Sequence, residues 1–435
     1  MHSVRLRLVV FALLMALSVA PWIRGQSAPS ASQATESARP LDLKALVKEA
    51  LERNPQVLAA RRAVEGRRDR IPQARAWPDP TVTLSYGGNL LPPYTLMSRD
   101  PSSARQFTAA EEVPYPGKTR LRGQIAARQA DGELLAYEAL WRQVAGEVKQ
   151  AYFDLYVADQ SLSTVRKDRE LLRTFEKLAE VRYSVGKAAQ QDVLKAQVDL
   201  TRLSERETLL DQQRRTLEAQ LNGLRDLPPD SPVGPTGRVH AHPLAIGLED
   251  LEKAAEANSP ELKQAQTGVD AGRLGVQLAQ KEVRPNFSVG YTYMQRAGLP
   301  DMYGFSFSTS LPVFHRRKQD MAVAEAAANL EASRHSEENV LALLRSRVRQ
   351  EFLAAQAAER LMDLYSQALL PQSRLALDSS LATYGTGTTD SLSVLTNFST
   401  LLDYELSYQQ QLAEHEKALA RLEELTGLDL LQAER

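Results

Sequence analysis

Two stretches of the chain, near residues 119–183 and 318–383, are predicted to be helices of unusual length. In the first stretch, apolar side chains recur about every 3.5 residues, from Leu134 through Trp141 to Leu155, a period typical of coiled-coil packing. At a rise of about 1.5 Å per residue, each stretch would extend over roughly 95 Å. Helices of this length do not fit a compact domain, so the sequence predicts a rod of aligned helices.

Two shorter segments interrupt the helical pattern, because apolar and small polar residues alternate in them. Alternation with a period of two predicts β-strands, here in hairpins at 81–114 and 286–312. One face of each hairpin would be apolar and aromatic, and the other would carry Ser, Thr and Gly. The apolar face is expected to comprise Val82, Leu84 and Tyr86 of the first hairpin and Phe287, Val289, Tyr291, Tyr293, Phe305 and Phe307 of the second.

The same order of segments occurs twice along the chain. We expect a first repeat over 41–225 and a second over 248–430, each with a helix, a hairpin, a long helix and a further helix. A Pro/Gly-rich linker over 226–247 joins them. The opening helix is predicted as one element from Leu41 to Trp77. The landmarks that recur are the pairs Pro55 and Pro260, Pro80 and Pro285, Tyr183 and Tyr384, and Gly186 and Gly387.

Residues 1–28 have the features of a secretory signal peptide. Arginines precede an apolar run from Leu8 to Ala20, which is shorter than the ~20 residues that a membrane-spanning helix needs. The polar residues 29–40 are expected to form a tether. Since no later apolar run reaches that length, the sequence predicts an exported protein without a transmembrane helix.

Charge and composition narrow the possible partners. The formal net charge is −1 and the chain contains no cysteine. A nearly neutral chain lacks the positive field that attracts nucleic acid, so no nucleic-acid partner is expected. Disulfides and thiolate metal sites are excluded as well.

The predicted strands are about as long as a tilted strand that crosses a bilayer, which has about 9–11 residues. Four strands cannot close a barrel, since the smallest membrane barrels have about eight, and open edges in lipid would leave backbone groups unsatisfied. We therefore expect several copies to share one barrel, with the apolar face toward lipid. The alternative is a soluble sheet that caps a helical bundle.

Over about 41–430 the chain resembles the TolC-like outer-membrane efflux channel family. The resemblance rests on three segments in a fixed order, which are "ALVKEALERNPQVLAARRAVEGRRDRIPQARAWPDPTVTLS" in the first half, "YSVGKAAQQDVLKAQVDLTRL" after the first long helix, and "LPVFHRRKQDMAVAEAAANLEA" after the second hairpin.

The resemblance implies a mainly α fold with a small transmembrane β part and an internal two-fold duplication. Long coiled helices would form an α-barrel tunnel, and four strands per subunit would contribute to a twelve-stranded β-barrel shared by a homotrimer. The linker at 226–247 would lie in an equatorial region around the tunnel. No cofactor is implied.

The resemblance further implies a passive conduit of a tripartite efflux system in the outer membrane, with a large periplasmic extension. Its partners would be outer-membrane lipid, a periplasmic membrane-fusion adaptor and an inner-membrane pump, for which the resemblance favours the RND type. The segment "VPYPGKTR" at 113–120 is similar to the heavy-metal and copper branch, so metal ions or drugs are the expected substrates. The alternatives are a type I secretion channel, a soluble periplasmic coiled-coil scaffold, and a periplasmic hydrolase, for which no catalytic set stands out.

The resemblance places two Tyr-x-x-Gly segments at the periplasmic entrance of the tunnel. Asp192 matches an acidic residue that lines this entrance, where three copies would form a ring that attracts cations; alternatively, it is a solvated residue at a helix start. Thr389 stands where the best-known member has a gating arginine, and Ser393 and Thr396 replace its main aspartate ring. Asp390 is a candidate substitute. The two segments comprise Tyr183 with Gly186 and Tyr384 with Gly387.

Two clusters of basic or metal-binding residue types have simple explanations. His240 and His242 could ligate a metal, but no third ligand is near in sequence, so an ordinary loop and no metal site are expected. The basic run His315–Lys318 could contact lipid headgroups. We expect it to form a solvated junction between barrel and helix.

Overall fold

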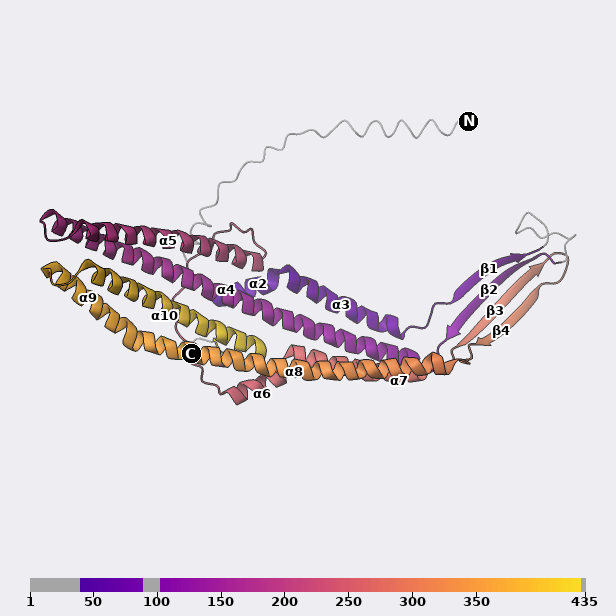
Figure 1. The fold of residues 1–435 in the computed structure, drawn as a ribbon. Helices are drawn as coiled ribbons and strands as arrows, with labels where there is room; N and C mark the ends of the chain where they lie inside the picture. Colours follow the sequence, from indigo (N-terminus) through magenta and orange to yellow (C-terminus); the bar gives the residue numbers. More distant parts are fainter. Residues whose placement is uncertain (1–39, 89–101, 432–435) are drawn as a thin grey trace, which may run out of the picture.

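The computed structural model describes residues 40–88 and 102–431. The predicted signal peptide, nearly all of the tether and the loop 89–101 of the first hairpin lie outside the described residues. Within them, the protein is an elongated bundle of helices with a small sheet at one end (Figure 1).

The prediction of a single opening helix is wrong, because two helices form this segment: α2 (Leu43–Arg53) and α3 (Pro55–Arg75). Asn54 separates them: its side chain accepts hydrogen bonds from the backbone N–H groups of Gln56 and Val57 and so caps α3. Pro55 occupies the first turn, where its missing N–H costs nothing. The second half has the same break at Ser259, between α6 (Leu248–Asn258) and α7 (Pro260–Glu282).

The long helices agree closely with the prediction. Helix α4 (Lys118–Ser184) has 67 residues and is followed by α5 (Gln190–Leu224). In the second half, α8 (Gln319–Leu364) continues through a π-helical turn (Tyr365–Leu369) into α9 (Leu370–Thr386). The wider turn accommodates Pro371, which has no N–H and would clash with the preceding turn of a regular helix. Helix α10 (Ser391–Thr426) completes the set.

The shorter helices lie end to end along the long ones. Helices α3 and α5 pack on α4, while α7 and α10 pack on the helical stretch formed by α8 and α9. Both hairpins leave the bundle at the same end, and both helical turns, α4–α5 and α9–α10, lie at the other end (Figure 1). The mainly α fold class with a small β part is confirmed.

The hydrophobic core consists of separate layers along the rod. One layer near the helical turns contains Phe175, Tyr384 and Phe398, and another, around Leu155 and Leu221, holds α2 and the linker against α4. A further layer joins α6, α8 and α10. Each layer is built from residues of both long and short helices, so these layers hold the long and short helices together.

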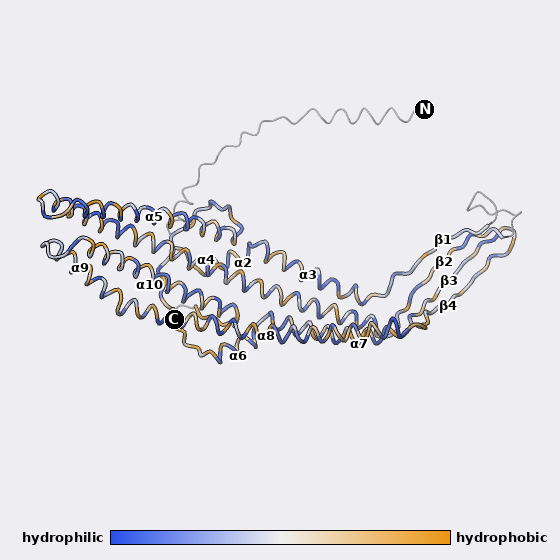
Figure 2. Tube along the Cα trace, viewed as in Figure 1, coloured by the Kyte–Doolittle hydropathy of each residue, from blue (hydrophilic) through white to orange (hydrophobic). Residues whose placement is uncertain are grey.

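Hydrophilic and hydrophobic residues are interspersed along the helices (Figure 2). Among residues 40–88 and 102–431, no helix combines the length and apolar character needed to span a membrane. Buried apolar side chains such as Val148, Val165 and Leu419 lie instead between helices.

Candidate functional site: the sheet and the helical turns

The two hairpins combine into one antiparallel sheet with the order β1-β2-β3-β4. The strands are β1 (Thr81–Gly87), β2 (Ala104–Val113), β3 (Phe287–Arg296) and β4 (Met302–Thr309). All four strands lie within the predicted hairpins 81–114 and 286–312. Because β2 pairs with β3, segments from the two halves of the chain form a single surface.

The pairing register places the predicted apolar residues on one face of this sheet. Leu84 lies opposite Phe107, which lies opposite Tyr293. In the second hairpin, Tyr291 lies opposite Phe305, and their ring centroids are 5.4 Å apart. The ring centroids of the neighbouring pair Tyr293 and Tyr303 are 5.5 Å apart. The four strands thus share a largely aromatic and aliphatic face, on which Glu111 lies opposite Val289 and Arg105 lies opposite Tyr86.

This apolar face is uncovered in a single chain. The side chains of Leu84 and Phe305 are 76% and 86% exposed. The opposite face carries small and polar groups, among them Thr108 and Thr292, whose hydroxyl groups are 3.1 Å apart. We expect an exposed apolar face of this kind to be covered by lipid or by another protein.

The junction between the sheet and the helices is fixed by a buried lysine. Lys118, only 2% exposed, is the first residue of α4. Its Nζ donates to Glu282 Oε2 at 2.8 Å, the carbonyl of Arg284 at 2.7 Å and Asn286 Oδ1 at 2.9 Å. Burial acts to raise the pKa of Glu282, but hydrogen bonds from Lys118 and Arg122 outweigh it and lower the pKa. The lysine therefore ties the start of α4 to the start of β3.

At the far end, the two helical turns have the same backbone geometry. Gly186 and Gly387 both have positive φ angles, 71° and 92°, which favour glycine. In each turn the next residue donates a backbone hydrogen bond to the residue five positions earlier, Lys187 to Arg182 at 2.8 Å and Thr388 to Thr383 at 3.0 Å. The two Tyr-x-x-Gly segments are thus equivalent helix ends.

The two tyrosines of these segments are not equivalent in their surroundings. Tyr183 is 47% exposed, whereas Tyr384 is 2% exposed and packs against Phe175. The guanidinium carbon of Arg182 lies 4.5 Å from the centroid of the Tyr384 ring, a cation–π contact. Arg182 also donates to the carbonyl of Lys187 at 3.1 Å. One arginine of the first turn therefore holds the tyrosine of the second.

Asp192 connects the same two turns. Its Oδ1 accepts a hydrogen bond of 2.6 Å from the hydroxyl of Ser391, the first residue of α10. Burial, followed by the nearby Asp192 carboxylate, raises the pKa of Tyr384. Asp192 is therefore neither a free carboxylate nor simply a solvated residue at a helix start, since it joins α5 to α10 within one chain.

Thr389 and Asp390 have local partners. The Thr389 hydroxyl donates to Thr383 Oγ1 at 2.7 Å. Asp390 caps α10, accepting from the backbone N–H of Ser393 at 3.1 Å. Hydrogen bonds from the side chain and backbone of Ser393 lower the pKa of Asp390, so it is ionised at neutral pH.

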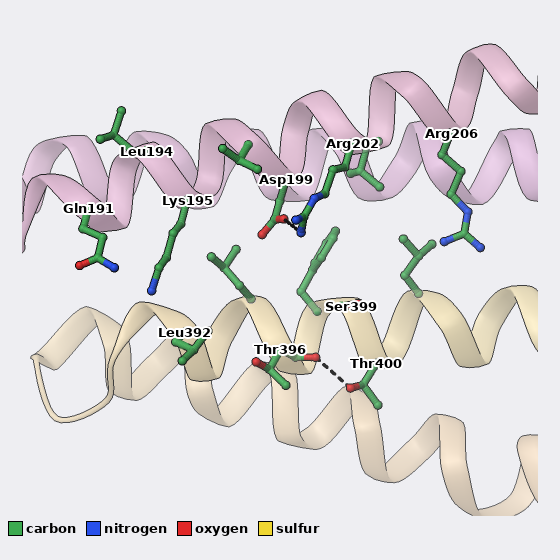
Figure 3. A pocket seen from close by; sticks show the side chains of 15 residues that line it. Gln191, Leu194, Lys195, Asp199, Arg202, Arg206, Leu392, Thr396, Ser399 and Thr400 are labelled. Atoms are coloured by element: carbon green, nitrogen blue, oxygen red, sulfur yellow. Dashed lines mark hydrogen bonds and ion pairs between the residues drawn. The ribbon is translucent and has the colours of Figure 1, made fainter.

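A groove lies beside the turns, between α5 and α10 (Figure 3). Lys195, Arg202 and Arg206 line one side, with Asp199 paired to Arg202 at 3.0 Å. Apolar side chains such as Leu392 line the other side. The groove therefore offers positive charge and apolar surface together.

The His-x-His segment connects the linker to the helical bundle and is not a free loop. His242 Nδ1 lies 2.7 Å from Glu416 Oε2, and its backbone N–H donates to Oε1 of the same carboxylate. His415 contacts two carbonyl oxygens, those of Ala355 and His242. No group of three or more metal-ligating side chains is found in the part of the chain that the structure describes.

Sequence reasoning missed the roles of Lys118, Arg182 and Ser391. Each is adjacent to a recognised motif: Lys118 follows the Pro-Gly turn, Arg182 precedes Tyr183 and Ser391 follows Asp390. Their partners lie far away in the sequence, so local patterns could not reveal them.

The profile of a family described as outer membrane efflux protein matches residues 46–224 and 251–428. The chain belongs to this family. It is an outer-membrane efflux protein, and the predicted resemblance is confirmed.

Individual relatives of this outer-membrane efflux protein are distant. Protein CyaE of Bordetella pertussis is 27% identical over 289 residues, which cover 63% of this chain and 60% of that protein. The match therefore spans less than two thirds of the relative. The structure of the outer-membrane channel OprN has a TM-score of 0.76 at 18% identity, covering 94% of this chain and 98% of that one. The structure of CusC has a TM-score of 0.77 at 14% identity, covering 93% and 95%. These similarities show the fold.

Proposed function

We propose that this protein is a passive channel that forms a homotrimer, with twelve strands in a shared barrel and the helices as a periplasmic tunnel. The observation that carries the proposal is the sheet: four strands share one largely apolar face, and β1 and β4 are its edge strands among the described residues. In lipid such edges must be paired. A symmetric ring of copies supplies that pairing.

In this arrangement the apolar face meets lipid and the Ser, Thr and Gly face lines the exit. The Tyr293 hydroxyl donates to Asp301 Oδ2 at 2.7 Å beyond the end of β3. A tyrosine with a polar tip and an apolar body suits the membrane–water interface. The export signal predicted at 1–28 fits the same location.

The helical turns would form the periplasmic entrance. Asp192, Ser391, Arg182 and Tyr384 hold the two turns of each chain together, and three copies would surround one axis. An adaptor would dock near the groove between α5 and α10, whose lysine and arginines suit acidic partners and whose leucines suit apolar ones. An inner-membrane pump, of RND type by the family resemblance, would supply the energy and select metal ions or drugs.

A type I secretion channel is the second candidate, since the same tunnel could pass an unfolded polypeptide. Protein CyaE is one relative whose sequence aligns with this chain. The two candidates differ in the partner pump and not in the geometry of this chain.

Light scattering and planar bilayers test the proposed function. Detergent-purified protein should have the mass of three chains and should form discrete conductance steps in a planar lipid bilayer. A monomer that remains in aqueous buffer after membrane removal would overturn the proposal and favour a periplasmic scaffold.

A further inference from the structure

His415 is a buried histidine of α10 whose two ring nitrogens both face oxygen acceptors. The residue is only 1% exposed. Its Nδ1 lies 3.0 Å from the backbone carbonyl oxygen of Ala355 in α8, and its Nε2 lies 2.7 Å from that of His242 in the linker. A carbonyl oxygen only accepts hydrogen bonds, and a neutral imidazole carries a hydrogen on one nitrogen alone. The geometry therefore fits the doubly protonated, positively charged ring.

The next residue along α10 supplies the matching negative charge. The Glu416 side chain is completely buried and accepts hydrogen bonds from the backbone N–H of His242 at 2.9 Å and from its Nδ1 at 2.7 Å. Burial raises the pKa of Glu416, whereas the hydrogen bonds from His242, followed by the charges of the two histidines, act to lower it. A buried ion is costly unless it is paired and hydrogen-bonded. A carboxylate beside an imidazolium meets this condition for both groups.

Other charged groups around this part of α10 are paired with one another. Lys417 pairs with Asp154 of α4 at 2.7 Å and with Glu414 at 2.9 Å. Glu359, one helical turn after Ala355 on α8, is half-buried. Helices α4, α6 and α8 pack on α10, and the ion pairs that they form around it are Lys149–Glu423, Glu252–Arg349, Glu256–Arg345 and Glu351–Arg421. The lysine and arginine closest to Glu416 in sequence are thus engaged by other carboxylates, which leaves the histidines to balance its charge.

A proton on His415 connects three segments of the fold. The ring bridges α8 and the linker, and its charge balances the carboxylate that binds the backbone of His242. Without that proton, one ring nitrogen would present a lone pair to a carbonyl oxygen, and Glu416 would keep an unbalanced buried charge. Both changes cost free energy in a buried site.

We propose that His415 is held as an imidazolium and that its proton fastens the linker 226–247 to α8 and α10, so that this attachment loosens as the pH rises. The attached linker binds one proton that the released linker gives up. Histidine in an unfolded chain has a pKa of about 6.5. Attachment is therefore complete below this value and weakens as the pH rises through the range in which the attached ring loses its proton. All these contacts lie within one chain, so the inference does not depend on the proposed trimer.

Limited proteolysis measures release of the linker directly. Arg238 is exposed on the linker, four residues before His242, so trypsin cleavage after it reports local release. Cleavage of the full chain in detergent is followed by mass spectrometry between about pH 6.5 and 9 and divided by the rate of trypsin on a short peptide at each pH. The normalised rate should rise with pH, by up to about tenfold per pH unit, because release frees one proton. A normalised rate that stays constant or falls would overturn the inference.

The variant His415→Gln assigns the effect to one residue, because an amide donates a hydrogen bond but does not titrate. Its normalised rate should exceed that of the wild type at the lowest pH and should no longer depend on pH. His335→Gln is the matched control, since His335 is exposed on α8 and lies 3.0 Å from Glu338. The control should keep the pH dependence of the wild type. Persistence of this dependence in His415→Gln, or its loss in the control, would contradict the assignment.

Nitrogen NMR of the wild type in lipid tests the protonation state without a destabilising variant. Near pH 7, at which most exposed histidines are neutral, one ring of the protein made with isotope-labelled histidine should carry hydrogen on both nitrogens. A spectrum in which every ring has one unprotonated nitrogen would overturn the proposal. Glu416→Gln keeps the shape of its side chain but removes the charge, so the doubly protonated signal should disappear at a lower pH than in the wild type. An unchanged signal would contradict the pairing of the two charges.

Discussion

Glu416 of α10 binds His242 of the linker through both carboxylate oxygens, with distances of 2.9 Å to the backbone N–H and 2.7 Å to Nδ1. The Glu416 side chain is completely buried. Burial raises its pKa, and the hydrogen bonds from His242 partly offset the increase. A buried carboxylate with two donors from one residue fixes the linker on the helical bundle.

Replacing His242 is therefore expected to destabilise the protein. His242→Ala removes one donor from a buried carboxylate and should lower the free energy of unfolding by about 1–3 kcal/mol. Thermal unfolding followed by circular dichroism measures the change. His240→Ala is the matched control, because His240 is exposed and two residues away. Equal midpoints for the two variants would show that the contact does not hold the linker.

The partly buried carboxyl group of Glu424 should make stability depend on pH. Burial and, secondarily, the charges of Glu147 and Glu261 raise its pKa to about 7 from an ordinary value of 4.5. The folded state then binds the proton more tightly than the unfolded state, so this contribution is present below pH 4.5 and is lost as the pH rises through 7.

Glu424→Gln should remove this dependence. The variant should be more stable than wild type at pH 8, by at most about 3 kcal/mol, and similar to it at pH 4.5. Thermal midpoints in detergent at both pH values provide the measurement. If the wild type gained stability relative to Glu424→Gln between pH 4.5 and pH 8, the assignment would be contradicted.

The contacts of Lys118 at the junction between the sheet and the helices should also be sensitive to one substitution. Lys118→Met leaves the Arg284 carbonyl without its Lys118 donor, while Asn286 Oδ1 retains the Tyr115 N–H and Glu282 retains Arg122. We expect a loss of about 1–3 kcal/mol, measured by thermal unfolding. Arg120→Met removes the same charge two residues away at an exposed position and should have little effect.

An arginine on the apolar face of the sheet should prevent normal insertion. Phe307→Arg would place a charge at mid-membrane depth at a cost of about 2–4 kcal/mol. Ser308→Arg lies next to it on the polar face and is the matched control. Outer-membrane fractionation compares the two. Equal amounts of both variants in the membrane would mean that this face does not meet lipid.

Asp192→Asn should alter the conductance or the cation selectivity of single channels in planar bilayers. The substitution removes a negative charge near the turns and weakens the acceptor of the Ser391 hydroxyl. Asp403→Asn, which affects a surface ion pair with Arg206, serves as a control. Wild-type values for the Asp192 variant would show that it does not line a constriction.

Periodicity predicted the long helices well because their apolar spacing is sustained over many turns. It failed at Asn54, where the spacing continues across a capped break between two helices. It also gave no sign of the π-helical turn before Pro371, because a proline in a helical pattern predicts a break and not a wider turn. The spacing of apolar residues indicates which side of a segment is buried, whereas the positions of caps and turns depend on individual side chains.

The candidate site was predictable only in part. Alternation identified the apolar strand residues, and the pairing register places them on one face. Arg182 and Lys118 were missed because their partners, Tyr384 and Asn286, lie in the other half of the chain. Contacts between distant segments follow from the packing of the fold, which a single sequence does not display.

The contacts of Lys118 have a consequence for the order of assembly. Its partners are on the same polypeptide, so their effective concentration is high and the junction can form as soon as the chain folds. In the proposed trimer, the joints between neighbouring chains must instead wait for a diffusing partner, and the rate at which they form depends on how many chains are present. In such a trimer, the duplication within one chain makes three of the six joints between hairpins internal, so that three encounters between molecules would close the ring.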